Sequence, residues 1–340
     1  MSFSKSSQAA KMCLILLSYE PQNNNRLVVI SNRDEFFDRS TEPTHYWSAQ
    51  EIRSAVSRST NKEDEKPQQL SEVTILAGRD SIGGGTWLGI DPKRNRFAAV
   101  TNFRMGMSTC LPRNSVVVNN NNNKRSEIQS SSRKRSRGSL PIDFITSDME
   151  SMEFLRQPHI TDGNIYDGFN MLVFDGKTLA YASNRKLDTC SSMADGEGGR
   201  PRELTGGIYG LCNGLLDDPW PKVVKGKELL EAELREQKLS PSSDIETSNI
   251  TCLMNIMLDT ERPPDDLLPD TGIPIELERG YSSIFVHVPS IEYGTRSSGL
   301  VVMDGNGVQL FAEREYVRRG EEGGEETEYE MDTVIFRDFA

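Results

Sequence analysis

The chain has 340 residues, a formal net charge of −12 at pH 7 and 36% hydrophobic residues. This length allows one or two domains with a large core, and the acidic balance argues against a nucleic-acid-binding protein. No apolar run approaches the length of a membrane-spanning helix, so we expect no transmembrane segment. The five cysteines never form a C-x-x-C pair, which argues against a disulfide framework or structural zinc and favours a reducing compartment. The three histidines show no metal-ligand spacing, so the sequence predicts neither a metal nor a cofactor.

Residues 1–11 are rich in serine and contain no acidic residue. Three interpretations stay open: an over-extended gene model, a segment that is removed, or a weak mitochondrial presequence. The segment lacks arginine, and it lacks the apolar stretch of a secretory signal. We therefore treat residues 1–11 as an extension that precedes a single domain over residues 12–340.

The domain opens with two apolar runs, residues 12–19 and 27–30, around a turn-forming stretch at residues 21–25. Two β-rich runs around a short polar turn predict an antiparallel hairpin. Both runs are apolar on both faces, so we expect the hairpin in a central sheet.

The register of this hairpin decides which residue lies opposite Cys13 on the second strand. In one register Cys13 lies opposite Asn32, with Asp34 diagonal to the thiol. A slip of one residue brings Arg33 to the thiol instead. In either register a thiol, a guanidinium and a carboxylate converge at one strand end, although a lone strand cysteine is commonly just a small buried side chain.

The next stretch reads as a polar surface loop over residues 51–71 and a strand over residues 73–78. A second hairpin is expected from residues 86–90 and 96–103. The three glycines at 83–85 lack the spacing of a phosphate-binding loop, so they indicate a turn or a close backbone approach.

Residues 113–139 form a low-complexity insertion with an asparagine run, seven Lys or Arg residues and one Glu. We predict a disordered loop here, while a nuclear signal or a tether to an anionic surface is an open alternative.

The remaining pattern alternates paired strands with clustered helices. We expect helices over residues 141–157 (with an N-cap at Ser147), 219–237 and 243–259; strands over 169–174, 179–183, 207–213, 282–288, 298–303, 308–311 and 334–338; and an acidic loop over 320–330. The absence of βαβ alternation predicts an α+β fold built on antiparallel sheets.

A series of motifs resembles the transport and Golgi organisation protein 2 family, also called the NRDE family. Resemblance to this family implies a link to Golgi organisation and protein secretion, with some members tied to mitochondria and to haem or lipid handling. On this basis we expect a cytoplasmic protein associated with the Golgi or with mitochondria. The motifs, in family order, are Met12-Cys13-Leu14-Ile15, Asn32-Arg33-Asp34-Glu35-Phe36, Gly84-Gly85-Thr86-Trp87-Leu88-Gly89-Ile90, Ala99-Val100-Thr101-Asn102-Phe103, Gly168-Phe169-Asn170, Tyr209-Gly210-Leu211-Cys212-Asn213, Pro219-Trp220-Pro221-Lys222 and Tyr293-Gly294-Thr295-Arg296.

The strand-first layout and the Met-Cys start also resemble the N-terminal nucleophile (Ntn) hydrolases of the choloylglycine hydrolase and penicillin acylase branch. This resemblance implies a four-layer αββα sandwich of two antiparallel sheets. It also implies a catalytic set, which here matches Cys13, Arg33, Asp34, Asn102, Asn213 and Arg296. That branch separates its Arg and Asp by two residues, whereas they are adjacent in this chain.

The resemblance assigns each of these residues a role toward an amide or thioester ligand. Cys13 is the nucleophile and its own free α-amine the base, which requires that residues 1–12 be absent. Arg33 favours the thiolate and Asp34 orients the amine. The remaining residues stabilise the oxyanion (Asn102, Asn213) and hold the amine region or a substrate carboxylate (Arg296).

Two other interpretations stay open. Asparagines at strand ends are ordinary turn residues, and Arg33 with Asp34 or Glu35 can form a structural ion-pair network. A non-enzymatic protein that binds haem or an acyl lipid in the same pocket is the alternative function.

Overall fold

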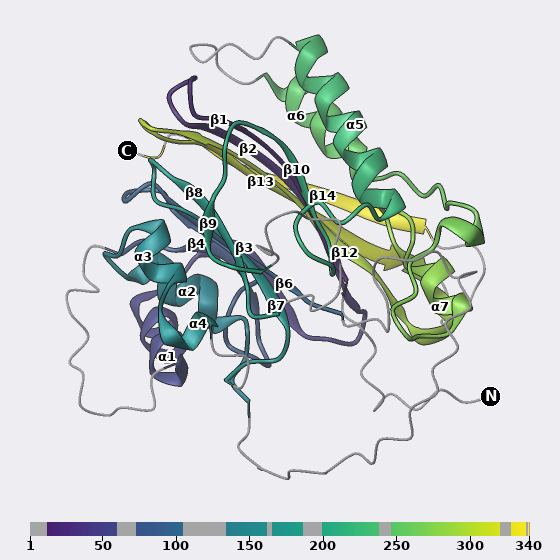
Figure 1. Ribbon diagram of the computed structural model, residues 1–340, viewed down its shortest axis with the longest axis horizontal. Coiled ribbons are helices and arrows are strands. Elements are labelled where there is room, and N and C mark those ends of the chain that lie inside the picture. Colours follow the sequence, from purple (N-terminus) through teal and green to yellow (C-terminus); the bar gives the residue numbers. More distant parts are fainter. Residues whose placement is uncertain are drawn as a thin grey trace.

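The computed structural model describes residues 12–59, 73–104, 134–161, 165–185, 199–237, 246–319, 328–337 and 339. Two antiparallel sheets stack face to face, and helices cover the outer face of each sheet (Figure 1). The predicted α+β sandwich of four layers is therefore confirmed.

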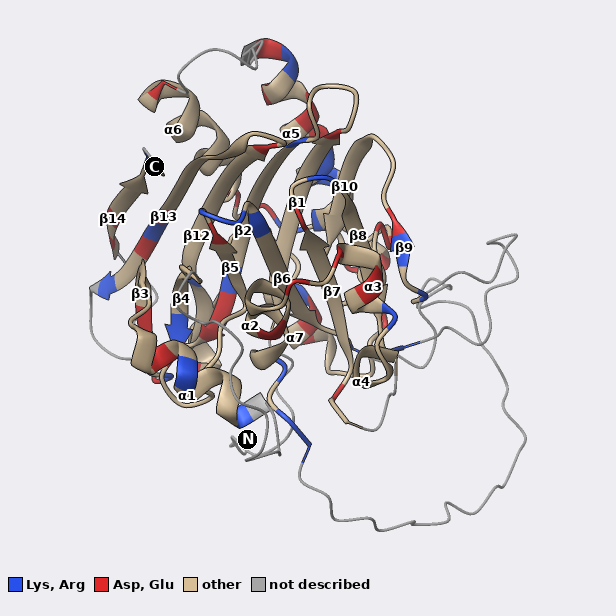
Figure 2. Ribbon diagram, turned by 90° about the vertical axis from the view of Figure 1, so that its left-hand side faces the viewer, with Lys and Arg blue, Asp and Glu red and all other residues tan. Residues whose placement is uncertain are grey.

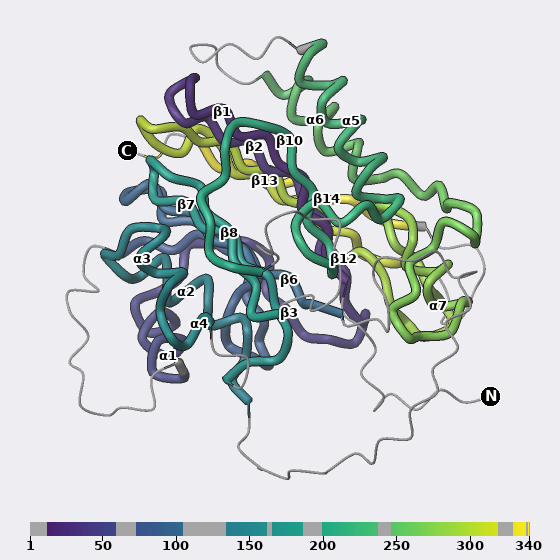
Figure 3. Tube along the Cα trace, viewed as in Figure 1, coloured from purple at the N-terminus to yellow at the C-terminus, as the bar shows by residue number. Residues whose placement is uncertain are grey.

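The first sheet, sheet A, contains the expected hairpin near its centre. Its strand order is β10-β1-β2-β12-β13-β14, and β11 pairs with β12. Figure 3 shows that strands from the two ends of the chain, purple and yellow, lie in this one sheet. The strands are β1 (Cys13–Glu20), β2 (Arg26–Phe36), β10 (Gly207–Leu211), β11 (His287–Val288), β12 (Tyr293–Asp304), β13 (Gly307–Arg319) and β14 (Glu328–Phe336).

The second sheet, sheet B, is a meander in which each strand pairs with the next along the chain. The strands are β3 (Thr41–Tyr46), β4 (Leu76–Asp80), β5 (Leu88–Asp91), β6 (Arg96–Asn102), β7 (Phe169–Phe174), β8 (Leu179–Ser183) and β9 (Arg202–Glu203).

The helices separate into two groups, one for each sheet (Figure 1). Those covering sheet B are α1 (Ala49–Ser59), α2 (Ser139–Thr146), α3 (Ser151–Leu155) and α4 (Pro158–Thr161). Those on the side of sheet A are α5 (Pro221–Gln237), α6 (Thr247–Ile256) and α7 (Ile275–Gly280), with short 3-10 turns at Asp265–Leu267 and Pro289–Ile291. No described helix is long and apolar enough to cross a membrane.

Side chains of β1 point alternately to the two faces of sheet A, and each face packs in a separate hydrophobic core. Leu14 and Leu16 pack with α5 and α6, whereas Ile15, Leu17 and Tyr19 pack between the two sheets. A third core lies between sheet B and its helices. Since successive strand residues point to opposite faces, three apolar layers require four layers of structure.

The observed register is the second of the two considered, in which Cys13 lies opposite Arg33 rather than Asn32. Glu20 pairs with Arg26 to close the turn, whose Asn24 and Asn25 adopt the left-handed conformation that asparagine tolerates. This register keeps apolar residues opposite apolar residues on the face between the sheets, and a slip would expose them.

Several local predictions need correction. A helix, α1, occupies the start of the expected loop at residues 51–71, because Ser48 bonds reciprocally with Glu51 in a capping box. The predicted helix 141–157 is interrupted between α2 and α3, and Ser147 caps the end of α2 rather than the start of a helix. Only His287–Val288 of the expected strand 282–288 is a strand, and β14 begins at Glu328, inside the expected acidic loop.

The predicted insertion at residues 113–139 lies largely outside the described residues. Its last part, residues 134–139, is described and runs into α2. Arg135 forms a β-bridge with Tyr166, so this end of the segment is attached to the domain.

Candidate functional site

A cavity of about 540 Å³ opens beside the end of the β1–β2 hairpin. Strands of both sheets and the segment before α2 contribute to its wall. Strands β3, β4 and β13 contribute to the wall, and Figure 2 shows that charged residues of both signs occur along them. Five of the six candidate residues line it: Cys13, Arg33, Asp34, Asn102 and Arg296.

Cys13 is the first residue of β1 and is 8% exposed. The antiparallel pairing places Arg33 directly across from it, and the backbone N–H of Asp34 donates to the Met12 carbonyl at 3.1 Å. The thiol therefore lies at the wall of the cavity, held by the central ladder of sheet A.

Burial raises the pKa of the Cys13 thiol to about 12. The Asp34 carboxylate contributes to this rise, whereas the Arg33 guanidinium and the Asp34 backbone N–H oppose it. The expected effect of Arg33 is present, but desolvation outweighs it. With Met12 attached, the thiol is thus protonated at neutral pH and a poor nucleophile.

Asp34 is a buried carboxyl group with only one oxygen satisfied. Its Oδ1 accepts a hydrogen bond from Thr295 Oγ1 at 2.7 Å, while Oδ2 is buried without a hydrogen-bond partner. Burial raises the pKa of Asp34 to about 6, although Lys222 opposes this rise. A buried carboxylate oxygen without a donor is costly, and beside a thiol in a cavity wall it makes Asp34 a candidate functional residue.

Polar groups contact Met12, the residue before Cys13. The Met12 N–H donates a short hydrogen bond to the Tyr293 hydroxyl, which donates to the Asp34 carbonyl at 3.0 Å. The Met12 side chain is buried, and Nη1 of Arg104 lies 3.0 Å from its sulfur. Met12 is therefore held through its N–H by Tyr293 and through its carbonyl by the Asp34 N–H, next to the thiol.

The ion-pair interpretation of the Asn-Arg-Asp-Glu run holds for Glu35. Its carboxylate lies 3.8 Å from Arg33 Nη2 and 3.3 Å from Arg39 Nε. Arg39 in turn pairs with Asp80 at 2.5 Å. These contacts leave Asp34 outside the network and tie the end of β2 to sheet B.

Arg296 reaches the cavity from a β-bulge. The pairing between β2 and β12 shifts between Thr295 and Ser297, so Arg296 is the extra residue. Its Nη1 donates to the carbonyls of Phe36 at 2.9 Å and Phe37 at 3.1 Å. The bulge turns a guanidinium toward the Cys13 cavity without breaking the sheet.

The two asparagines lie together but contribute differently. Asn102 ends β6 and lines the cavity. Asn213 is fully buried behind it, with Nδ2 donating to the Asn102 carbonyl at 2.8 Å and its own carbonyl accepting from Arg104 N–H at 2.8 Å. Asn213 thus supports the Asn102 backbone and is not among the described lining residues.

The glycine motif before Trp87 allows a close backbone approach. Gly84 has φ +73°, and a Cβ on Gly85 would lie 2.2 Å from the Gly138 carbonyl oxygen. That carbonyl accepts from the Thr86 N–H at 3.0 Å. The contact fixes residues 135–138 against the cavity, which confirms the close-approach interpretation.

Sequence reasoning missed several groups around Cys13. Tyr293 and Thr295 belong to the Tyr-Gly-Thr-Arg motif, so the motif itself was their signal. Arg137 lines the cavity but belongs to a basic, low-complexity run that resembles a solvated segment. Nothing in the local pattern distinguishes Arg137 from its basic neighbours.

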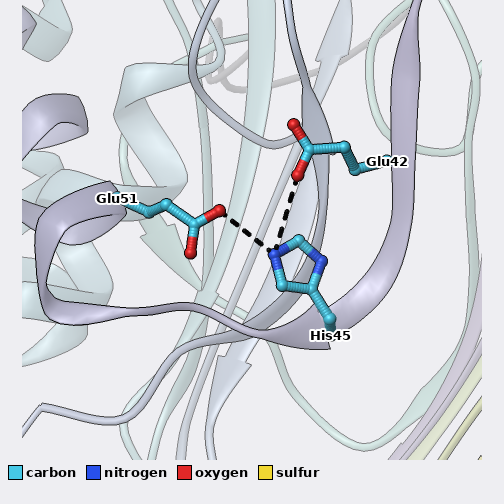
Figure 4. Close-up of side chains that lie close together, drawn as sticks. All are labelled: Glu42, His45 and Glu51. Carbon is cyan, nitrogen blue, oxygen red and sulfur yellow. Dashed lines mark hydrogen bonds and ion pairs between the residues drawn. The ribbon is translucent and has the colours of Figure 1, made fainter.

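One cluster among the described residues has the composition of a metal site: Glu42, His45 and Glu51 (Figure 4). His45 Nε2 lies 3.9 Å from Glu42 and 3.3 Å from Glu51. However, Arg79 Nη1 also contacts both carboxylates, at 3.4 and 3.2 Å. A guanidinium already pairs with both acids, so the cluster is an ion-pair network that attaches α1 to sheet B.

We predict that Asp34 lowers stability at neutral pH. Because its folded pKa is raised, the contribution of Asp34 to stability is greatest below pH 4 and falls as the pH rises from about 4 to about 6. Asp34→Asn should remove up to about 3 kcal/mol of this fall, at about 1.4 kcal/mol for each pKa unit. Urea unfolding at pH 4, 5, 6 and 7 measures it, and a parent–variant difference that stays constant with pH contradicts the prediction.

Two nearly isosteric substitutions should change Cys13 reactivity in opposite directions. Asp34→Asn removes a charge that raises the thiol pKa, whereas Arg33→Gln removes one that lowers it. Iodoacetamide labelling of Cys13 at pH 8 should therefore be faster in Asp34→Asn and slower in Arg33→Gln, by about tenfold for each pKa unit. Peptide mass spectrometry follows the rate, with the exposed Cys252 as internal control. Equal changes in both variants would rule out this electrostatic control.

Comparison with known proteins places this chain in one family. Residues 12–318 match the family model described as "Transport and Golgi organisation 2". A transport and Golgi organization protein 2 homolog from Bos taurus is 30% identical over 338 residues, covering 96% of this chain and 99% of the relative. The Homo sapiens homolog is 30% identical, with 89% and 92% covered, and the Drosophila melanogaster protein is 24% identical, with 89% and 91% covered. The chain belongs to the transport and Golgi organisation 2 family.

Proposed function

We propose that this protein, in a form that begins at Cys13, is a cysteine-nucleophile hydrolase of small amides or thioesters with an Ntn-hydrolase-like fold. The observation that carries the proposal is the unpartnered Oδ2 of Asp34, buried beside the Met12–Cys13 peptide. In the uncleaved chain this oxygen has no donor, and an α-ammonium group on Cys13 would supply one.

Removal of residues 1–12 would lower the pKa of the Cys13 thiol. Desolvation is the main cause of the raised pKa of the thiol, and we expect a chain that begins at Cys13 to admit more water at this end of β1. In its neutral form the new α-amine is the base that the amide nitrogen cannot be, and once it has taken the thiol proton it is a positive charge next to Asp34. Arg33, which lies opposite Cys13, then favours the thiolate against a smaller desolvation penalty.

The reaction follows from these positions. The α-amine takes the thiol proton, the sulfur attacks the carbonyl carbon, and the leaving amine or thiol takes that proton to depart. A water molecule then cleaves the acyl–sulfur bond and regenerates the thiol. Asn102 supplies amide N–H groups for the oxyanion, and Asn213 acts through Asn102 by holding its backbone.

Haem or an acyl lipid is the alternative ligand, and the cavity wall weighs against both. Arginines and carboxylates from both sheets surround the cavity, and its described lining includes no histidine. An acyl chain or a porphyrin requires a largely apolar slot. A small polar amide or thioester suits this wall better.

The Cys13 form can be tested directly. A fusion whose removal leaves Cys13 at the N-terminus should hydrolyse some member of a panel of acyl p-nitroanilides and acyl thioesters. The full-length chain, lacking the free amine, and the Cys13→Ala variant should be at least about 10²-fold slower, as expected for loss of base or nucleophile. Intact-mass spectrometry should detect an acyl adduct on Cys13. Equal rates for all three proteins would refute the proposal.

The family name further suggests where this activity is used. The relatives are named for transport and Golgi organisation. We propose that this protein acts on the cytoplasmic side of that process, at the Golgi or at mitochondria. Imaging of a carboxy-terminally tagged chain beside Golgi and mitochondrial markers tests this, and a signal at neither organelle would contradict it.

A further inference from the structure

The arginines around the Cys13 cavity are not equivalent. Arg39 pairs with Asp80, and Arg79 pairs with Glu42. Arg137, in contrast, donates from Nη1 to the Gly168 carbonyl at 2.9 Å, and no carboxylate in the described part of the chain lies within 4.0 Å of it. An arginine that lines a cavity without a carboxylate partner retains its donors for a ligand.

Arg137 faces the cavity from the sheet B side. Its position depends on the close approach of Gly85 to Gly138 and on the Thr86 N–H bond to the Gly138 carbonyl at 3.0 Å. The bond to Gly168 then fixes the guanidinium itself. Cys13 belongs to sheet A, so a ligand between the two layers can contact the thiol and Arg137 at once.

The electrostatics agree with this placement. Burial lowers the pKa of Arg137, and Asp167 and then Cys13 are the charges that oppose this most strongly. Asp167 is itself paired with Lys134 at 2.8 Å. Arg137 is therefore close enough to sense a charge on the Cys13 sulfur and only partly neutralised by its surroundings.

We propose that Arg137 is a specificity-determining residue that binds a carboxylate of the ligand, so that the cavity takes small acyl amides or thioesters bearing a carboxylate on the acyl chain. This inference rests on the proposed function of Cys13 for the reaction, but the anion site can be tested without turnover. A guanidinium matches a carboxylate with two parallel hydrogen bonds, which lysine cannot reproduce.

The test measures ligand binding to the full-length chain by isothermal titration calorimetry. The probes are succinamate, glutaramate and adipamate, each compared with the neutral diamide of the same length. At least one acid should bind the parent about tenfold more tightly than its diamide, as one charge-assisted contact provides. Arg137→Gln should abolish that preference, and Arg137→Lys should keep only part of it.

Two other arginines provide controls. Arg235→Gln removes the same charge from the exposed helix α5 and should leave the preference unchanged. Arg296→Gln tests the other cavity arginine whose described hydrogen bonds go to backbone carbonyls. If the preference survives Arg137→Gln but disappears in Arg296→Gln, the proposal is wrong.

The outcomes separate this inference from the proposed function. No preference for any acid in the parent, which is measured without any substitution, overturns the anion site. A clear preference that depends on Arg137, together with no hydrolysis by the chain that begins at Cys13, supports the anion site and refutes the hydrolase.

Discussion

The pairing of β1 with its two neighbours in sheet A is the constraint on which the site depends. Leu14 and Leu16 must face the helices while Ile15 and Leu17 face sheet B, and this alternation excludes a slip of one residue. That register puts Arg33 opposite Cys13 and Asp34 beside the Met12 carbonyl. The same apolar packing that stabilises the sandwich thus fixes the polar groups at the strand end.

Burial sets the chemistry of this strand end more strongly than any charge pair does. Desolvation is the largest cause of the raised pKa of both Cys13 and Asp34, so in the uncleaved chain the thiol stays protonated and the carboxylate forms only as the pH approaches neutral. A carboxyl group with an unpartnered oxygen lowers stability, and an apolar residue there would pack without that penalty. The Asp34 carboxyl group is understandable at this position if, in a chain that begins at Cys13, the α-amino group supplies the missing hydrogen-bond donor.

The cavity combines this strand end with a second, independently built wall. Glycines 84 and 85 let the backbone before α2 approach within hydrogen-bonding distance, and that segment carries Arg137. Most neighbouring arginines are neutralised by carboxylates, whereas Arg137 contacts a carbonyl. A ligand that reaches from Cys13 to Arg137 would connect the two sheets.

The sequence alone determined the α+β class, the central hairpin and five of the residues that line the cavity, because apolar alternation and ordered motifs are local properties of the chain. It could not choose between two hairpin registers, since both satisfy the local turn composition, and only packing between the sheets selected one. It also gave no reason to single out Arg137, because which arginines form ion pairs depends on carboxylates that are distant along the chain. The supporting role of Asn213 and the unpartnered oxygen of Asp34 were decided in the same way, by burial and contacts that exist only in the folded protein.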